Sequence, residues 1–179
     1  MFVVPRLFGR KCALVYVDDS PDDHFLLQHS VLTTETPFHI QPFFSAEPAI
    51  AYVKGDPPFQ DGSVNPFPTL VLCDYDLKIS QGPELVSVLR AIPSCANLPI
   101  FMFSSSDDQS WVLASHAAGA DGYLCKPSGA GRLDTLVRTL YACTMSEPRR
   151  FEVLTLLPEY RPFPHTTTPS APDVSRRAA

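Results

Sequence analysis

The sequence predicts an α/β protein built on a five-stranded, parallel, doubly wound sheet with five helices. Short, wholly apolar runs recur along the chain, and each is followed by a stretch whose apolar residues have helical spacing. Strands that are apolar on both faces belong inside a parallel sheet, and right-handed crossovers then leave few topologies. A chain of 179 residues, 45% of them hydrophobic, has room for one such domain with an appendage.

The strands are expected where the apolar runs are short and uninterrupted. Residues 12–17 (CALVYV) are too few for a buried helix and rich in β-forming residues, so they predict an interior strand. Pro42 cannot donate to a sheet, which makes 38–44 an edge strand or an irregular one. The remaining strands are expected at 69–73, 99–103 and 122–125.

The helices are expected in the amphipathic stretches that follow the strands. Ser20 can cap the first helix, Pro21 suits its first position, and the acids Asp22 and Asp23 suit its positive end. This helix should run to about residue 32, and its residues with near-helical apolar spacing are Phe25, Leu26, His29 and Leu32. The other helices are expected at 46–54, 82–92, 107–118 and 132–143.

Proline and loss of periodicity set the expected domain limits. Residues 1–11 are interpreted as an N-terminal extension and 12–145 as the folded domain, within which 55–68 is a long surface loop. Residues 146–179 are rich in proline, serine and threonine, so we expect a mobile tail without a core of its own. Within that tail, Val153 to Leu157 is the segment that could dock on the domain.

Composition argues against several classes of partner. The formal net charge is −5 and there is no local basic patch, so we expect no binding to nucleic acid. No window approaches 18 uninterrupted apolar residues and the start lacks the pattern of a signal peptide, so we expect a cytoplasmic protein without a membrane segment. The five cysteines form no C-x-x-C pair, which favours reduced thiols over a zinc site or disulfides.

Polar residues gather where the expected strands end. Asp18 and Asp19 follow the first strand, Asp74 and Asp76 the third, Ser104 the fourth and Lys126 the fifth. In an open α/β sheet the carboxyl ends of the strands form the ligand site. Clustered carboxylates repel one another unless a divalent cation neutralises them, and ligands that are all oxygen favour Mg²⁺ or Mn²⁺ over zinc. A lysine and a hydroxyl beside such a metal could hold a phosphoryl group.

From about Cys12 to Cys143 the chain resembles the receiver domains of bacterial two-component response regulators, in particular the stand-alone type. The resemblance rests on the acidic pair in LVYVDDSPDD, the aspartate in LVLCDYDL, the hydroxyl residue in PIFMFSSSDD and the lysine in GADGYLCKP. It implies a flavodoxin-like sheet with the strand order 2-1-3-4-5. Lys78 departs from the family pattern, in which proline is usual.

The resemblance also implies roles for single residues. Asp74 resembles the phosphoacceptor, a carboxylate that attacks the phosphorus of a phosphohistidine. Asp18, Asp19, Asp74 and the backbone carbonyl of Asp76 would bind Mg²⁺, and Lys126 and Ser104 would contact the phosphoryl oxygens. Tyr123 occupies the aromatic switch position, although it could equally be a core aromatic. The phosphoryl donor would be a sensor histidine kinase or a histidine phosphotransfer protein.

The output would be contact with an unknown downstream protein, and we expect it on the face formed by 107–118, 122–125 and 132–143. Two other interpretations stay open. Asp74-Tyr75-Asp76 resembles the D-x-D motif of haloacid-dehalogenase-type phosphatases, but their acidic pair comes last in the chain, whereas Asp18 and Asp19 come first. The chain could also be an interaction module that kept the receiver fold without using phosphorylation.

Overall fold

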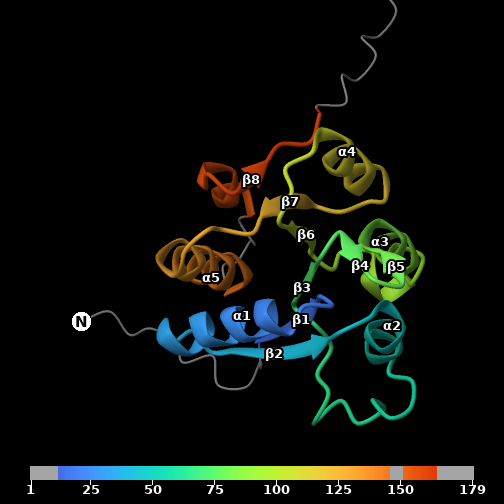
Figure 1. Ribbon diagram of the computed structural model, residues 1–179. Coiled ribbons are helices and arrows are strands. Elements are labelled where there is room, and N and C mark those ends of the chain that lie inside the picture. Colours follow the sequence, from blue (N-terminus) through green and yellow to red (C-terminus); the bar gives the residue numbers. More distant parts are fainter. Residues whose placement is uncertain (1–11, 146–150, 165–179) are drawn as a thin grey trace, which may run out of the picture.

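The computed structural model describes residues 12–145 and 151–164, which form three layers with a twisted sheet between two layers of helices (Figure 1). The strands are β1(Cys12–Val17), β2(Phe38–Phe43), β3(Leu70–Cys73), β6(Ile100–Ser104), β7(Gly122–Cys125) and β8(Tyr160–Arg161). Their order is β2-β1-β3-β6-β7-β8, and the first five are parallel. The predicted five-stranded sheet of order 2-1-3-4-5 is therefore confirmed, with β2 at an edge as Pro42 indicated.

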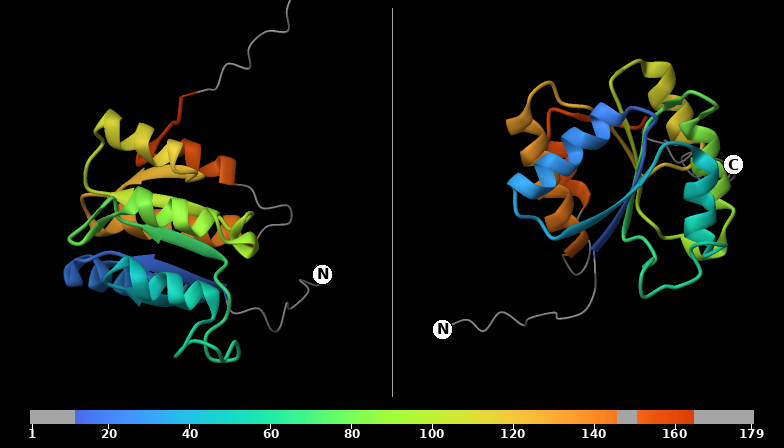
Figure 2. Two further views of the ribbon diagram at one scale, coloured as in Figure 1. Left: turned by 90° about the vertical axis from the view of Figure 1, so that its right-hand side faces the viewer. Right: turned by 60° about the horizontal axis from the view of Figure 1, so that its bottom comes forward.

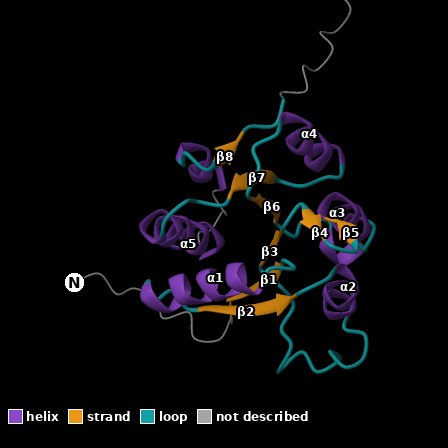
Figure 3. Ribbon diagram, viewed as in Figure 1, coloured by secondary structure: helices purple, strands orange, loops and turns teal. Residues whose placement is uncertain are grey.

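The helices cover the two faces of the sheet unequally (Figure 2, Figure 3). One face carries α1(Pro21–Thr33) and α5(Ala130–Met145), and the other carries α2(Ala46–Lys54), α3(Gly82–Arg90) and α4(Gln109–Ala117). A short 3-10 turn, η1(Pro93–Cys95), precedes β6. The central strands are buried on both faces and separate two apolar clusters, one under α1 and α5 and one under α2, α3 and α4. This double burial explains why the strands read as continuous apolar runs.

The first helix buries a different face from the one its apolar residues suggested. Phe25, Leu26 and Leu32 are 66%, 50% and 71% exposed, whereas His24, Leu27, Ser30 and Val31 are buried. Both buried polar residues make hydrogen bonds: His24 Nε2 lies 2.8 Å from the Asp18 carbonyl oxygen, although its Nδ1 has no partner, and Ser30 Oγ donates to Asp134 Oδ1 of α5 at 2.5 Å. Because burial costs little for hydrogen-bonded polar groups, apolar spacing alone did not predict this face.

The expectation that 146–179 is a tail without structure is wrong over 151–164. Residues Phe151–Leu156 form the 3-10 helix η2, and β8 then pairs antiparallel with β7 as a sixth strand. Leu154, in the segment singled out for docking, is fully buried in the cluster under α5. The Glu159 carbonyl accepts from the Cys125 amide at 2.8 Å. Residues 146–150 and 165–179 lie outside the described residues.

Two connections also bear on the site. Residues 55–68 form the predicted surface loop, anchored where the Tyr52 hydroxyl donates to the Pro66 carbonyl at 2.6 Å. After β3, the short strands β4(Asp76–Leu77) and β5(Ser80–Gln81) pair as a small hairpin that the sequence did not indicate. Over the described ranges, none of the helices combines the length and the apolar character that a membrane crossing requires.

Candidate functional site

The carboxyl ends of β1, β3, β6 and β7 surround a cavity of about 370 Å³. All the predicted site residues except Tyr123 line it, together with residues that the sequence did not single out. Its lining includes Asp18, Asp19, Asp23, Asp74, Asp76, Ser104, Trp111 and Lys126. The prediction that the strand-end residues meet at one edge of the sheet is thus confirmed as geometry. Their chemical roles remain predictions.

Three carboxylates converge at the floor of this cavity. Asp18, Asp19 and Asp74 each place one oxygen so that the three atoms lie within 4.8 Å of one another. Asp18 is fully buried and Asp74 is 7% exposed, so water screens their repulsion poorly. Hard oxygen donors in this number fit Mg²⁺ or Mn²⁺, which take carboxylate and carbonyl ligands. The structure therefore offers a donor set suited to a divalent cation.

The surroundings of the Asp74 carboxyl disfavour its ionised form. Burial raises its pKa, the Lys126 ammonium lowers it in part, and the neighbouring Asp18 raises it again, so that the net pKa is above the ordinary value. The Asp76 amide donates to Asp74 Oδ2 at 3.2 Å, and this holds the side chain toward the cavity. Asp76 itself lines the cavity, and the role of its backbone carbonyl stays a prediction.

Lys126 is the cation at the centre of the site. Its Nζ lies 2.6 Å from Asp18 Oδ2, 2.9 Å from Asp23 Oδ2 and 3.1 Å from Asp74 Oδ1. Burial by itself would lower the pKa of this ammonium, but the carboxylates of Asp74 and Asp18 outweigh burial and hold the pKa above its ordinary value. Lys126 therefore stays charged at neutral pH. The contact with Asp23 was missed, because an acid in the first turn of a helix is already explained by the helix dipole.

The other two predicted metal ligands differ in how firmly they are held. Asp18 accepts from the Tyr16 hydroxyl at 2.5 Å and from the Ser20 amide at 2.9 Å, so its position is fixed. Asp19 pairs with Lys78 Nζ at 3.0 Å, but the Lys78 side chain is 77% exposed. An exposed pair of this kind contributes little. Asp19 is thus free to exchange Lys78 for a metal ion.

Gly82, the first residue of α3, lets the loop after Asp74 pack closely against this helix. A Cβ on Gly82 would lie 2.1 Å from the Asp74 carbonyl oxygen and 2.6 Å from Met102 Cε. The Gly82 amide donates to the Tyr75 carbonyl at 2.7 Å, which closes the turn containing the β4–β5 hairpin. Glycine is therefore required here by close approach of the backbone.

Ser104 and Tyr123 are connected through Ser106. Ser104 is the last residue of β6 and is 2% exposed, and its Oγ accepts from the Ser106 amide at 3.4 Å. The ring of Tyr123 is fully buried, and its hydroxyl donates to the Ser106 carbonyl at 2.8 Å. Burial raises the pKa of Tyr123 to about 12. Ser106, in the loop after β6, therefore contacts both Ser104 at the cavity and Tyr123 in the core.

An aromatic pair closes one side of the cavity. Tyr75 follows Asp74 directly and stacks on Trp111 of α4, with ring centroids 4.1 Å apart and an interplanar angle of 6°. This contact brings the only tryptophan of the chain to the site. Trp111 is not among the site residues predicted from the sequence.

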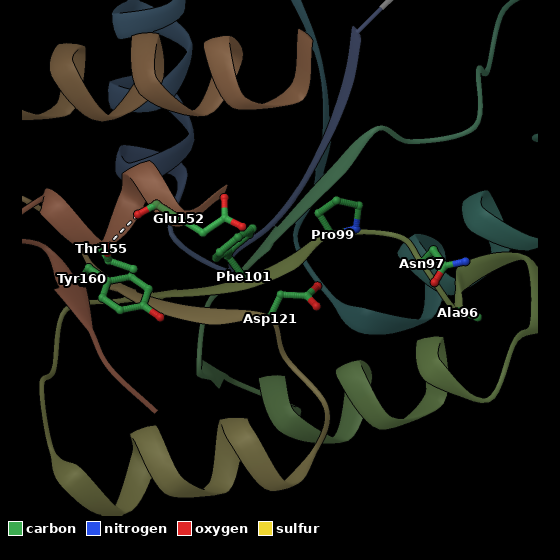
Figure 4. A pocket seen from close by; sticks show the side chains of 8 residues that line it. All are labelled: Ala96, Asn97, Pro99, Phe101, Asp121, Glu152, Thr155 and Tyr160. Atoms are coloured by element: carbon green, nitrogen blue, oxygen red, sulfur yellow. Dashed lines mark hydrogen bonds between the residues drawn. The ribbon is translucent and has the colours of Figure 1, made fainter. Parts of the chain in front are cut away.

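A second cavity, of about 490 Å³, lies at the other end of the sheet, and Figure 4 shows the side chains that line it. It opens at the amino ends of β6 and β7, and η2 and β8 complete its wall. Its lining includes Asp121 and Glu152 with the rings of Phe101 and Tyr160. None of the predicted site residues lines it.

Comparison with known proteins gives a consistent result. Residues 14–138 match the family model described as response regulator receiver domain. The chain is 32% identical over 117 residues to the alkaline phosphatase synthesis transcriptional regulatory protein SphR of Synechococcus elongatus. This alignment covers 62% of this chain and 44% of SphR. It is 23% identical over 113 residues to the response regulator Rcp1 of Synechocystis, covering 63% of this chain and 75% of Rcp1. The chain thus spans less than half the length of SphR.

Solved structures show the same fold. A response regulator of R. palustris red-light signalling, RPA3017, has a TM-score of 0.70 at 21% identity, covering 75% of this chain and 94% of that one. The phosphorylated cyanobacterial phytochrome response regulator RcpA has a TM-score of 0.68 at 20% identity, covering 77% and 96%. The Mn²⁺-bound form of Rcp1 has a TM-score of 0.62 at 22% identity, covering 73% and 91%.

Proposed function

The chain belongs to the response regulator receiver domain family, and on that premise we propose that it accepts a phosphoryl group on Asp74 and switches a protein-binding surface. The observation that carries the proposal is the cluster of Asp18, Asp19 and Asp74 beside the ammonium of Lys126. The proposed donor is a sensor histidine kinase or a histidine phosphotransfer protein, and the proposed location is the cytoplasm, where such donors present their phosphohistidine.

The proposed reaction is a displacement at phosphorus. A carboxylate oxygen of Asp74 forms a bond to phosphorus as the bond from phosphorus to the donor's imidazole nitrogen breaks, and that nitrogen keeps the electron pair. Asp18, Asp19 and Asp74 would hold Mg²⁺, which when bound neutralises charge on the carboxylates and the phosphoryl oxygens. Lys126 supplies a permanent positive charge to a phosphoryl oxygen, and the Ser104 hydroxyl can donate to another. The acyl phosphate that forms on Asp74 is the signal.

The signal would leave the site through the loop after β6. If Ser104 turns toward the phosphoryl group, its contact with Ser106 is lost, and Ser106 is the residue that the Tyr123 hydroxyl contacts. The proposed output face of α4, β7 and α5 is partly covered by residues 151–164. Arg161 pairs with Asp107 at 3.3 Å and Arg132 with Glu159 at 3.2 Å, so a downstream protein would meet this segment as part of the surface.

Of the two alternative interpretations, one is not supported and the other is tested by the experiment below. Receiver domains are phosphoacceptor signalling modules rather than enzymes, so the haloacid-dehalogenase interpretation is not supported. The interaction module that does not use phosphorylation remains a distinct outcome of the experiment below.

Incubation with Mg²⁺ and acetyl phosphate, followed by intact-mass measurement, tests the proposal. We expect a mass gain of one phosphoryl group, lost in Asp74→Asn and in EDTA, and retained in the matched control Asp56→Asn on the exposed loop. Phosphorylation that persists in Asp74→Asn would show that another residue is the acceptor. A folded protein that binds Mg²⁺ but gains no phosphate from acetyl phosphate or from histidine phosphotransfer proteins would favour the interaction module.

A further inference from the structure

Asp23 is a fourth carboxylate at the site and stands apart from the three clustered ones. It is the third residue of α1, and its side chain is 29% exposed. Its Oδ2 accepts a hydrogen bond from Lys126 Nζ at 2.9 Å. Neighbouring Asp22 has the same charge and lies in the same helical turn, but it is exposed and does not line the cavity. The helix dipole therefore accounts for both acids, but not for the contact that Asp23 makes.

We propose that Asp23 is a positioning residue that latches Lys126 in its resting place and competes with the phosphoryl group for it. A lysine ammonium has three N–H groups. Two of them donate to Asp18 and Asp23, and the ammonium forms an ion pair with Asp74 besides. The third N–H faces Asp74, and the ammonium can move toward a phosphoryl oxygen on that residue only as far as its hydrogen bonds to Asp18 and Asp23 allow.

Asp23 is the partner that yields. The Asp18 carboxylate is 1% exposed and is held by the Tyr16 hydroxyl and the Ser20 amide. Water cannot replace Lys126 there. The Asp74 side chain, 11% exposed, carries the phosphoryl group itself. The Asp23 carboxylate is the most exposed of the three, so water can solvate it when Lys126 leaves.

The latch sets how strongly the site binds a phosphoryl group. Removing the Asp23 charge would release a second N–H, and the ammonium could then move closer to the phosphoryl oxygen. A partly exposed ion pair contributes up to about 1 kcal/mol, which corresponds to about a three- to fivefold change in affinity. The inference rests on the proposed function, because it assumes that Lys126 contacts the phosphoryl group bound at Asp74.

Titration with beryllium fluoride in Mg²⁺, a phosphoryl analogue, tests the latch with Trp111 fluorescence as the readout. Trp111 lines the cavity and stacks on Tyr75, so its emission reports occupancy. In Asp23→Asn we expect half-saturation at about three- to fivefold lower beryllium fluoride, with the same maximal signal. Asp22→Asn should match the wild type, and Asp23→Glu should restore the wild-type value. Thermal melting shows that each variant is folded.

The outcomes separate this inference from the proposed function. If the wild type responds and Asp74→Asn does not, the site works as proposed, and equal affinities of Asp23→Asn and Asp22→Asn would then overturn the latch alone. Weaker binding by Asp23→Asn would also overturn it, since Asp23 would then help Lys126 rather than compete for it. A wild type that gives neither a fluorescence response nor a phosphoryl mass gain would overturn both proposals.

Discussion

Arg90 and Lys126 lie at opposite ends of the sheet, and each binds groups from several elements. Arg90 donates to the carbonyls of Gly119, Cys95 and Leu98 at 2.7 to 2.9 Å and pairs with Asp121 at 2.7 Å. Asp121 accepts in addition from the Ile100 amide at 2.7 Å. Here one cation meets one carboxylate, and the remaining partners are neutral carbonyls.

Lys126 meets three carboxylates, and a fourth, Asp19, lies beside them. The Arg90 network is therefore balanced in charge, while the Lys126 network holds an excess of negative charge, most of it buried. Balanced, hydrogen-bonded pairs contribute to folding, whereas unbalanced carboxylates are costly until a cation binds. From this difference we expect the Arg90 network to stabilise the fold and the Lys126 network to bind a ligand.

The largest expected effect is at the balanced end. Arg90→Met removes the hydrogen bonds to three carbonyls and to Asp121, so the free energy of unfolding should fall by about 2–4 kcal/mol. Urea unfolding measures this, with exposed Arg138→Met as the control. Mg²⁺ affinity should be unchanged. A loss below about 0.5 kcal/mol, the usual range of surface substitutions, would contradict the structural role.

The next largest effect is expected at Gly82, where the close approach of the backbone, and not the balance of charge, matters. Gly82→Ala places a Cβ 2.1 Å from the Asp74 carbonyl oxygen, and the loop must shift. We expect a loss of about 1–3 kcal/mol in unfolding free energy together with weaker Mg²⁺ binding. Gly62→Ala is the matched control, because a Cβ there meets no atom within 4 Å. Unchanged Mg²⁺ binding by the Gly82 variant would mean that the loop position does not set the site.

Mg²⁺ should stabilise the carboxyl end of the sheet. At a free concentration ten times the dissociation constant, binding to the folded state alone adds about 1.4 kcal/mol to the unfolding free energy. Thermal melting with Mg²⁺ and with EDTA measures the gain. Asp19→Asn should lose most of it, whereas the exposed Asp22→Asn should retain it. Equal gains in the two variants would remove Asp19 from the metal site.

The same contrast explains what the sequence could predict. Apolar strands and the order of the acidic motifs were sufficient for the five-stranded sheet and for the meeting of Asp18, Asp74 and Lys126. The pairing of Asp23 with Lys126 was not predictable, because it depends on how α1 is rotated above the sheet. That rotation also buries His24 and Ser30 and exposes Phe25, against the apolar pattern.

The C-terminal strand was missed for a different reason. Composition describes 146–179 as a whole, but a short segment can dock when single residues find partners. Leu154 is fully buried, and the Glu159 carbonyl continues the hydrogen bonds of β7. A two-residue strand such as β8 has too little alternation to stand out from a proline-rich background.

The smallest expected effect concerns the ionisation of Asp74 in metal-free protein. Because its pKa is raised above the ordinary value of 3.8, mainly by burial, the folded state holds the proton more tightly than the unfolded state. The ionised carboxylate therefore costs stability. That cost is absent below the ordinary pKa, and it grows as the pH rises until the raised pKa of the folded state is passed.

Asp74→Asn removes this cost, so at neutral pH in EDTA the variant should be slightly more stable than the wild type, by about 1 kcal/mol or less. The advantage should shrink as the pH falls toward the ordinary pKa, because the wild-type carboxyl then becomes protonated and neutral as well. Urea unfolding at a series of pH values measures both effects, and Asp56→Asn on the exposed loop is the control. An Asp74→Asn variant that is less stable at neutral pH would mean that the ion pair with Lys126 outweighs desolvation. The contrast between the balanced and unbalanced ends of the sheet would then fail at its central residue.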